Sequence, residues 1–154
     1  MYKRQDQTHS LNGSIFGSYK KWGANSVFQF GSGYPYTPVI TNYESQGGVL
    51  SNVLLRNSRR KSSTFRLDLK VHRDLMILGR KGKIYLRVQN LTDRRNEITV
   101  YGDSGNSNQT IEQKRAQITS EFEPMRPNTI DEFFNRPDWY DPPRRVQLGF
   151  QLSW

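Results

Sequence analysis

The feature that most constrains the fold is a run of strict alternation over residues 144–154. Apolar side chains occupy every second position of this run, namely Val146, Leu148, Phe150, Leu152 and Trp154. Polar or small residues stand between them. Because successive side chains of a β-strand point to opposite faces, the run predicts a strand with one apolar and one polar face. The alternation continues to Trp154, where soluble domains usually fray, so we expect this strand to be held in place.

The same period-two pattern recurs in four earlier segments. They predict strands at about residues 8–19, 22–31 and 65–78, and a fourth strand that begins at Ile84. The alternation of the fourth strand falters at residues 90–96, and a weaker alternation resumes at Ile98 and Val100. A β-bulge or an Asx-type turn within a long strand explains this break, and so does the end of the strand.

Short and long connections alternate along the chain. Residues 20–23 and 79–83 are short turns, whereas residues 31–63 and 102–143 are long passages rich in Gly, Pro and Ser. Within the second passage, residues 111–118 suit a helical turn or two. The chain is therefore predicted to be all-β, an antiparallel up-and-down meander of about five strands with every short turn on one side. This asymmetry is typical of a transmembrane β-barrel, whose long loops are extracellular.

The amino-acid composition is consistent with strands of a transmembrane β-barrel. Only 34% of the 154 residues are hydrophobic. Because no apolar run approaches the ~18 residues of a membrane-spanning helix, a helical membrane protein is excluded, whereas barrel strands need apolar residues only at alternate positions. The absence of cysteine excludes disulfides, thiolate catalysis and sulfur-ligated metals. The net charge of +9 allows a partner that is a nucleic acid or an anionic surface.

Four blocks of sequence, in order, resemble the last strands of TonB-dependent outer-membrane receptors. They are residues 28–38, 65–71, 85–96 and 143–150, and the resemblance extends over residues 8–154. Trp154 matches the terminal aromatic residue of that family, where Phe is more usual. The resemblance implies a segment of a transmembrane β-barrel of about 22 strands that closes around an N-terminal plug.

The resemblance also implies a location and partners. The chain is expected in the outer membrane of a Gram-negative bacterium, in contact with lipid and lipopolysaccharide, where it supports import of an unidentified ligand. Residues 6–154 would be the C-terminal part of the barrel. The plug and the segment that contacts TonB would lie upstream, so TonB is a partner only through that missing N-terminal region. Residues 1–5 are interpreted as a sequencing-adapter scar or a short disordered tail.

Two sets of residues are candidate sites. By the resemblance, the alternating residues of the last strand, Val146, Leu148, Phe150, Leu152 and Trp154, carry the signal read by the barrel-assembly machinery. The simpler interpretation is a strand that only closes the wall. Ligand or rim contacts are assigned to Tyr34, Tyr36, Arg59 and Arg60. The simpler interpretations there are an aromatic girdle for the tyrosines and a solvated loop for the arginines.

Other polar residues support no catalytic or metal site. Residues 103–106 faintly resemble the start of a calcium loop, but the later acidic ligands are missing and a turn is preferred. His9 and His72 are isolated, and no nucleophile stands beside a base in a recognisable arrangement, so we expect neither an enzyme nor a cofactor. On the polar face, Arg66, Asp68, Lys70 and Arg87 are expected to pair between neighbouring strands.

Two alternative functions remain open. A passive, porin-like outer-membrane barrel would have the same strands without a plug. The alternative from a different functional class is a soluble, basic sheet that binds nucleic acid, because residues 81–86 weakly resemble an RNA-binding strand. That alternative needs aromatic side chains on the basic face, where the alternation places Tyr85 but few others, so no nucleic-acid partner is expected.

Overall fold

The structure, a computed structural model, describes residues 6–39, 56–77, 79–120 and 129–152. The contacts within it divide the chain into two compact units. Residues 9–32, 64–95 and 142–154 form one of them, here called the sheet unit. Residues 1–8, 33–63 and 96–141 form the other, here called the loop unit. Each unit is described by itself.

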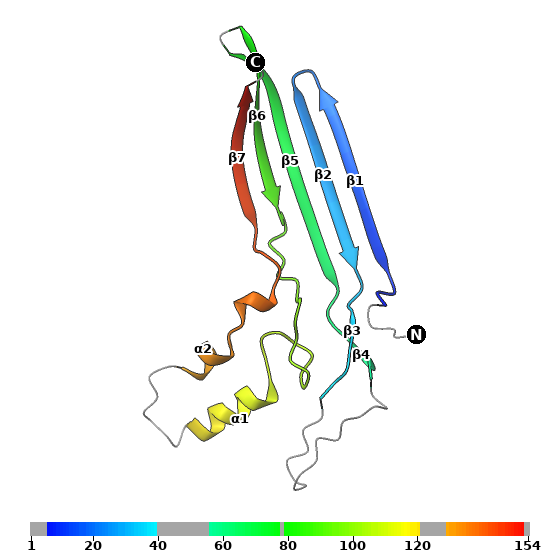
Figure 1. Ribbon diagram of the computed structural model, residues 1–154, viewed down its shortest axis with the longest axis vertical. Helices are drawn as coiled ribbons and strands as arrows, with labels where there is room; N and C mark the ends of the chain where they lie inside the picture. The colour runs from blue at the N-terminus through cyan, green and yellow to red at the C-terminus, as the bar shows by residue number, and fades with distance from the viewer. Residues whose placement is uncertain (1–5, 40–55, 78, 121–128, 153–154) are drawn as a thin grey trace. The chain divides into compact units, whose positions relative to one another are not determined.

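The sheet unit is a five-stranded antiparallel sheet (Figure 1). Its strands are β1 (Ser10–Tyr19), β2 (Trp22–Gly31), β5 (Thr64–Ile77), β6 (Arg80–Gln89) and β7 (Arg145–Leu152). They lie in the order β1-β2-β5-β6-β7, so every strand pairs with the next strand along the chain within this sheet. The predicted all-β, antiparallel meander of five strands is confirmed.

The strand register keeps the alternating side chains in rows across the sheet. Leu69 of β5 lies opposite Ser26 of β2 and Val88 of β6, and Val88 lies opposite Val146 of β7. Because paired residues of antiparallel strands share a face, the apolar positions of all five strands lie together. The apolar row that follows is Ala24, Val71, Leu86 and Leu148. One face of the sheet is therefore mainly apolar, although Arg73 and Arg80 also belong to it, and the other is mainly polar, although it includes Phe16 and Val27.

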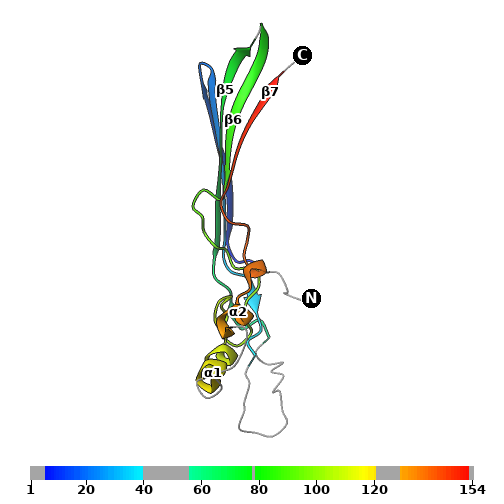
Figure 2. The ribbon, with the colours of Figure 1, turned by 90° about the vertical axis from the view of Figure 1, so that its left-hand side faces the viewer.

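The sheet is a single layer. Figure 2 shows it nearly edge-on, as one thickness of strands. Among the described residues, Val88 is the one buried hydrophobic residue, with an exposed fraction of 8%. A sheet normally buries its apolar face against a second layer. Here the apolar face has no such layer within the sheet unit.

The break in alternation after β6 is the end of that strand. Asn90 and Asp93 have positive φ angles of 51° and 53°. The buried Asn90 side chain donates from Nδ2 to the carbonyl oxygens of Arg94 (3.0 Å) and Pro142 (3.2 Å), and its Oδ1 accepts from the backbone N–H of Arg94. An asparagine tolerates this left-handed conformation and hydrogen-bonds its own turn. Asn90 therefore ends β6, and through Pro142 it anchors the segment that leads into β7.

The loop unit contains most of the two long passages, and their described parts are folded against each other. Its elements are β3 (Pro35–Tyr36), β4 (Arg59–Arg60), α1 (Ile111–Ser120), α2 (Ile130–Phe134) and a 3-10 turn, η2 (Pro137–Trp139). β3 pairs with β4, and the backbone N–H of Val39 donates to the carbonyl of Gly102 at 2.9 Å. The helical segment expected at 111–118 is confirmed as α1, whereas β3, β4 and α2 were not predicted.

Aromatic side chains and a helix cap stabilise the second passage. The Tyr101 ring lies 4.5 Å from that of Trp139 and 6.4 Å from that of Phe134, measured between ring centroids. Its hydroxyl donates to the carbonyl of Phe134 at 3.0 Å. Thr129 and Glu132 form a capping box that begins α2. None of the described helices combines the length and apolar character needed to cross a membrane.

Candidate functional site

The principal candidate site is the apolar face of the sheet. Its exposed side chains come from every strand: Leu11 and Ile15 of β1, Trp22 and Phe30 of β2, Ile77 of β5, Ile84 and Leu86 of β6, and Val146, Leu148 and Phe150 of β7. Leu148 has an exposed fraction of 73% and Ile15 one of 69%. Monomeric soluble proteins rarely expose a contiguous apolar patch of more than a few hundred Å². A surface that extends over five strands is suited to an apolar environment or partner.

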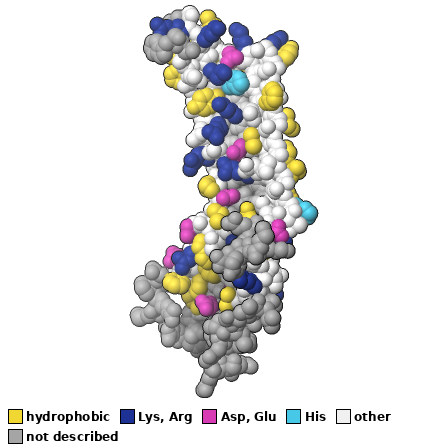
Figure 3. Space-filling model, turned by 45° about the vertical axis from the view of Figure 1, so that its right-hand side comes forward, with side chains coloured by type: hydrophobic (Ala, Val, Ile, Leu, Met, Phe, Trp, Pro, Cys, Tyr) yellow, Lys and Arg dark blue, Asp and Glu magenta, His cyan; other side chains and the backbone are white. Residues whose placement is uncertain are grey.

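The opposite face carries charges in a lengthwise band, and dark-blue Lys and Arg side chains follow the sheet in Figure 3. Arg66 pairs with Asp68 along β5, with Nε 3.0 Å from Oδ1, and Lys83 of β6 lies 3.6 Å from Asp74. The Lys70 ammonium lies 5.1 Å from the centroid of the Tyr85 ring, a cation–π contact. This face is suited to water or to polar partners.

The charged residues of β5 and β6 pair differently from what the sequence predicted. The register places Lys70 directly opposite Arg87, so two cations face each other. Like charges in that position repel. Asp68 instead accepts from Arg66 within its own strand and from the backbone N–H of Asn90 at 2.9 Å. From the neighbouring strand, Asp68 is attracted to the charge of Arg87, so among these four residues the expected interaction between strands is met at that pair alone. Alternation predicts the face of a residue but not its partner.

Two glycines make room for aromatic rings on the polar face. Gly23 lies opposite His72, and Gly149 lies opposite Tyr85. In each pair the ring covers the glycine so closely that an added Cβ would overlap it. A ring laid across a strand glycine restores the packing that the glycine lacks. These pairs keep His72 and Tyr85 against the sheet.

The predicted assembly residues lie on an edge strand. Val146, Leu148, Phe150 and Leu152 share the apolar face of β7, which pairs with β6 on one side and with no strand of this sheet on the other. Trp154 lies outside the described residues. An edge strand offers unpaired backbone groups to another strand.

The four predicted ligand or rim residues come together in the loop unit. Pairing of β3 with β4 sets Tyr36 opposite Arg59, and Lys61 donates its backbone N–H to the carbonyl of Tyr34 at 2.9 Å. The Arg60 guanidinium donates to the carbonyl oxygens of Asp6 (3.1 Å) and Gly33 (3.2 Å). The Tyr36 ring covers Gly105. Arg60 and Tyr36 thus hold the loops together. Tyr34, Arg59 and Arg60 are exposed, and Tyr36 is half-buried.

A carboxylate that sequence analysis missed links the two passages. Glu97 accepts from the Ser62 hydroxyl at 2.7 Å through Oε2, and from the backbone N–H of Ser107 at 2.9 Å through Oε1. Ser107 is buried, with an exposed fraction of 1%, and its hydroxyl donates to the carbonyl of Thr99. Nothing local to Glu97 signals this role, because its partners are 35 and 10 residues away.

The segment with a faint likeness to a calcium loop is a turn that caps α1. Gly105 has a φ of 75° and donates its N–H to the carbonyl of Tyr101 at 2.8 Å. Asp103 accepts from the Thr110 hydroxyl (2.6 Å) and from the backbone N–H groups of Ile111 and Ser104 (both 2.7 Å). Within the described residues, no group of His, Cys, Asp or Glu could hold a metal ion.

Those hydrogen bonds change the acidity of Asp103. Burial alone would raise the pKa of its carboxyl group, but the bonds from Thr110, Ile111 and Ser104 outweigh burial and hold the pKa below the usual 3.8. The unfolded chain therefore takes up this proton at a higher pH than the folded chain does. The stabilisation from Asp103 is complete above pH 3.8 and is lost as the pH falls through the lower folded value.

Acid should therefore loosen the start of α1. We expect the protection of the Ile111 amide against hydrogen exchange to decrease once the pH falls below 3.8, after correction for the intrinsic exchange rate. In an Asp103→Asn variant the protection should be low at neutral pH and should no longer depend on acid. Equal protection of Ile111 in the parent protein at neutral and acid pH would contradict this prediction.

Comparisons with protein-family models, curated proteins and solved structures gave no match.

Proposed function

We propose that this chain is the C-terminal wall segment of a TonB-dependent outer-membrane receptor. The apolar face of its sheet would lie in lipid, and the polar face would line the barrel lumen. The function would be structural support for the import of an unidentified ligand. The observation that carries the proposal is the single-layer sheet whose apolar face is uncovered across all five strands.

The energetics of the apolar face support a lipid environment. Burying a side chain such as leucine or phenylalanine contributes about 1.5–3 kcal/mol relative to leaving it in water. Leu11, Ile15, Leu86, Leu148 and Phe150 are all exposed. Lipid would remove their apolar surface from water, and the polar face would keep its charges in a water-filled lumen.

The edges and connections support a closed barrel. β1 and β7 each have one edge without a neighbour in the sheet. Backbone groups within a bilayer must be hydrogen-bonded, so both edges would pair with further barrel strands. The short turns leave one end of the sheet and the long passages leave the other, which would put the short turns in the periplasm and the loop unit outside the cell.

The candidate residues take roles within this proposal. β7 would present its edge to the barrel-assembly machinery by strand addition. Tyr34 and Arg59 would contribute to extracellular contacts with ligand or with lipopolysaccharide phosphates. TonB would act through a region outside this chain.

Single cysteines on neighbouring positions of β7 test which environment each face meets. The chain has no native cysteine, so a single introduced thiol is the one group in it that a maleimide labels. In intact protein in outer-membrane preparations, we expect a water-soluble maleimide to label Gln147→Cys and to leave Leu148→Cys unlabelled until detergent is added. These residues are adjacent and lie on opposite faces.

The outcome separates the proposal from its alternatives. Equal labelling of both positions would contradict a lipid-facing wall and would favour a soluble, nucleic-acid-binding sheet. Selective labelling of Gln147→Cys fits a receptor or a porin. Ligand uptake that persists unchanged in cells lacking TonB would then contradict the receptor and favour the porin.

A further inference from the structure

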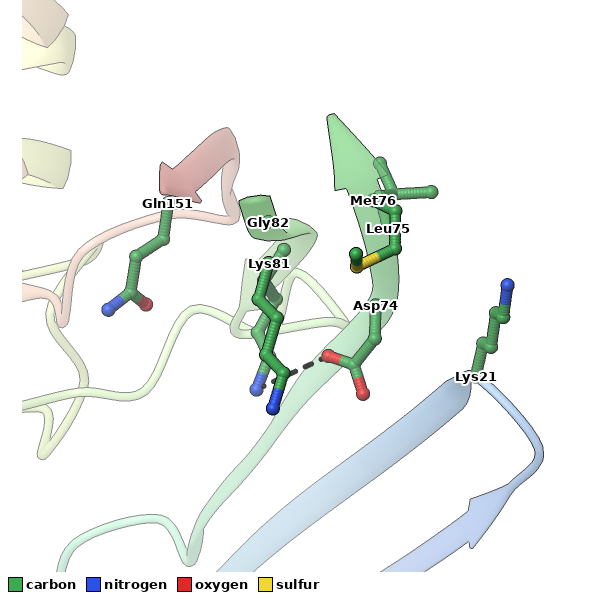
Figure 4. Close-up of a pocket in the computed structure, with 8 residues that line it drawn as sticks. Lys21, Asp74, Leu75, Met76, Lys81, Gly82 and Gln151 are labelled. Carbon is green, nitrogen blue, oxygen red and sulfur yellow. Dashed lines mark ion pairs between the residues drawn. The ribbon is translucent and has the colours of Figure 1, made fainter. Parts of the chain in front are cut away.

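A hollow opens on the polar face of the sheet unit, at the end where the short turns lie (Figure 4). Its volume is about 500 Å³. It is lined by Lys21, Asp74, Leu75, Met76, Lys81, Gly82, Lys83 and Gln151. These residues come from the β1–β2 connection, the end of β5, the start of β6 and the end of β7. Four segments of the chain therefore contribute to one small concave surface.

Positive charge exceeds negative charge in this hollow. Its lining contains three lysines and one acid, Asp74. Asp74 is 3.6 Å from Lys83, in a pair that is partly exposed. The ammonium groups of Lys21 and Lys81 have no acidic partner among the residues that the structure describes. The hollow thus retains two lysine charges that no carboxylate of the described chain compensates.

The register gives these residues a defined spacing along the backbone. Asp74 lies opposite Lys83, and Lys83 lies opposite Gln151, so they form a row across three strands. Lys21 extends this row, because its carbonyl accepts from the backbone N–H of Asp74 at 2.7 Å. Strands are about 4.8 Å apart, so the backbones of Lys21 and Lys83 are ~10 Å apart. Lys81 stands two residues from Lys83 along β6, a separation of ~7 Å on the same face.

We propose that this hollow binds a small multivalent oxyanion, such as a diphosphate or a polycarboxylate. Lysines whose backbones are ~7–10 Å apart carry their charges on long side chains, so two of them can contact two anionic groups of one ligand at once. The Gln151 amide can donate a further hydrogen bond. Asp74 opposes binding in two ways, since it repels the anion and neutralises Lys83. The site goes beyond the proposed transport role and depends on the fold of the sheet rather than on lipid.

Calorimetry with inorganic pyrophosphate tests the site in the full chain, held in uncharged detergent at low salt. We expect pyrophosphate to bind, and Lys21→Gln or Lys81→Gln to weaken binding about two- to fivefold each, the range of one exposed charge pair. Asp74→Asn should strengthen binding by a similar factor. Lys20→Gln is the matched control, because Lys20 is in the same turn and its ammonium lies over the Tyr19 ring instead of lining the hollow.

Each result decides the proposal. Weaker binding with Lys81→Gln, stronger binding with Asp74→Asn and no change with Lys20→Gln would support it. Equal weakening by Lys20→Gln and Lys81→Gln would overturn it, because that result indicates general charge attraction. Absence of binding by both pyrophosphate and citrate would also overturn it. If only one of them binds, the site is assigned to phosphate or to carboxylate ligands accordingly. The labelling of Leu148→Cys measures a different face, so each proposal can fail alone.

Discussion

Leu69→Arg should lower the free energy of unfolding of the protein in a bilayer by about 2–4 kcal/mol, the cost of an arginine near the bilayer midplane under the proposed assignment of the apolar face to lipid. Leu69 lies within β5, between Ser26 of β2 and Val88 of β6. Both neighbours lack a carboxylate, and the next residues on the same face of β5 are Leu67 and Val71. The introduced guanidinium would therefore lose its hydration without gaining an ion pair. Guanidinium-induced unfolding of the intact protein in lipid vesicles measures the change.

An arginine on the other face provides the control. Asn25 lies opposite Lys70 on the polar face, one residue from the row that contains Leu69. Asn25→Arg should cost less than about 1 kcal/mol, which is the scale of repulsion from a like-charged neighbour in water. If Leu69→Arg were no more harmful than Asn25→Arg, the assignment of the apolar face to lipid would be wrong.

Gly33→Ala should destabilise the loop unit by about 1–3 kcal/mol, as expected when a methyl group enters space that is already filled. Gly33 is buried, and a Cβ added to it would overlap the backbone carbonyl of Lys61. Lys61 follows β4, and its N–H donates to the carbonyl of Tyr34. The Lys61 backbone cannot move away from the added methyl group without weakening the pairing of β3 with β4. Thermal unfolding and hydrogen exchange at the Lys61 amide report the change.

Gly17→Ala is the matched control for that experiment. An added Cβ at Gly17 meets no atom within 4 Å, and Gly17 lies within β1. Its substitution should change stability by no more than about 0.5 kcal/mol, as is usual for an unobstructed surface position. If Gly33→Ala were equally harmless, the close approach of the Gly33 and Lys61 backbones would be wrong.

Sequence reasoning predicted the strands well because their signal is local. Alternation over ten residues is set by whether each position faces the apolar or the polar side. The predicted strand at 22–31 coincides with β2, and the last predicted strand, at 144–154, contains β7 (Arg145–Leu152). Both short turns were predicted too long: residues 22–23 belong to β2 and residues 80–83 to β6, because polar residues and glycines also occur within strands. Gly79, with a φ of 76°, lies just before β6.

The loop unit was largely missed, for identifiable reasons. β3 and β4 have two residues each, too few to show any period. α2 has five residues, although the Thr129 and Glu132 capping box stands in the sequence as a start signal. Of the proposed rim residues, Tyr36 and Arg60 contact Gly105 and Asp6, which are distant along the chain.

The sequence by itself determined where the five long strands lie and which face their alternating side chains occupy, because both follow from a two-residue period. Only the tertiary structure decided which residues are neighbours across the sheet, since register depends on turns and on long-range pairing. That register places Lys70 directly opposite Arg87, and it places Asp74, Lys83 and Gln151 in one row across three strands. The alternation of the last strand thus predicted its two faces. Which charged residues become neighbours on the polar face of the sheet depended on the strand register.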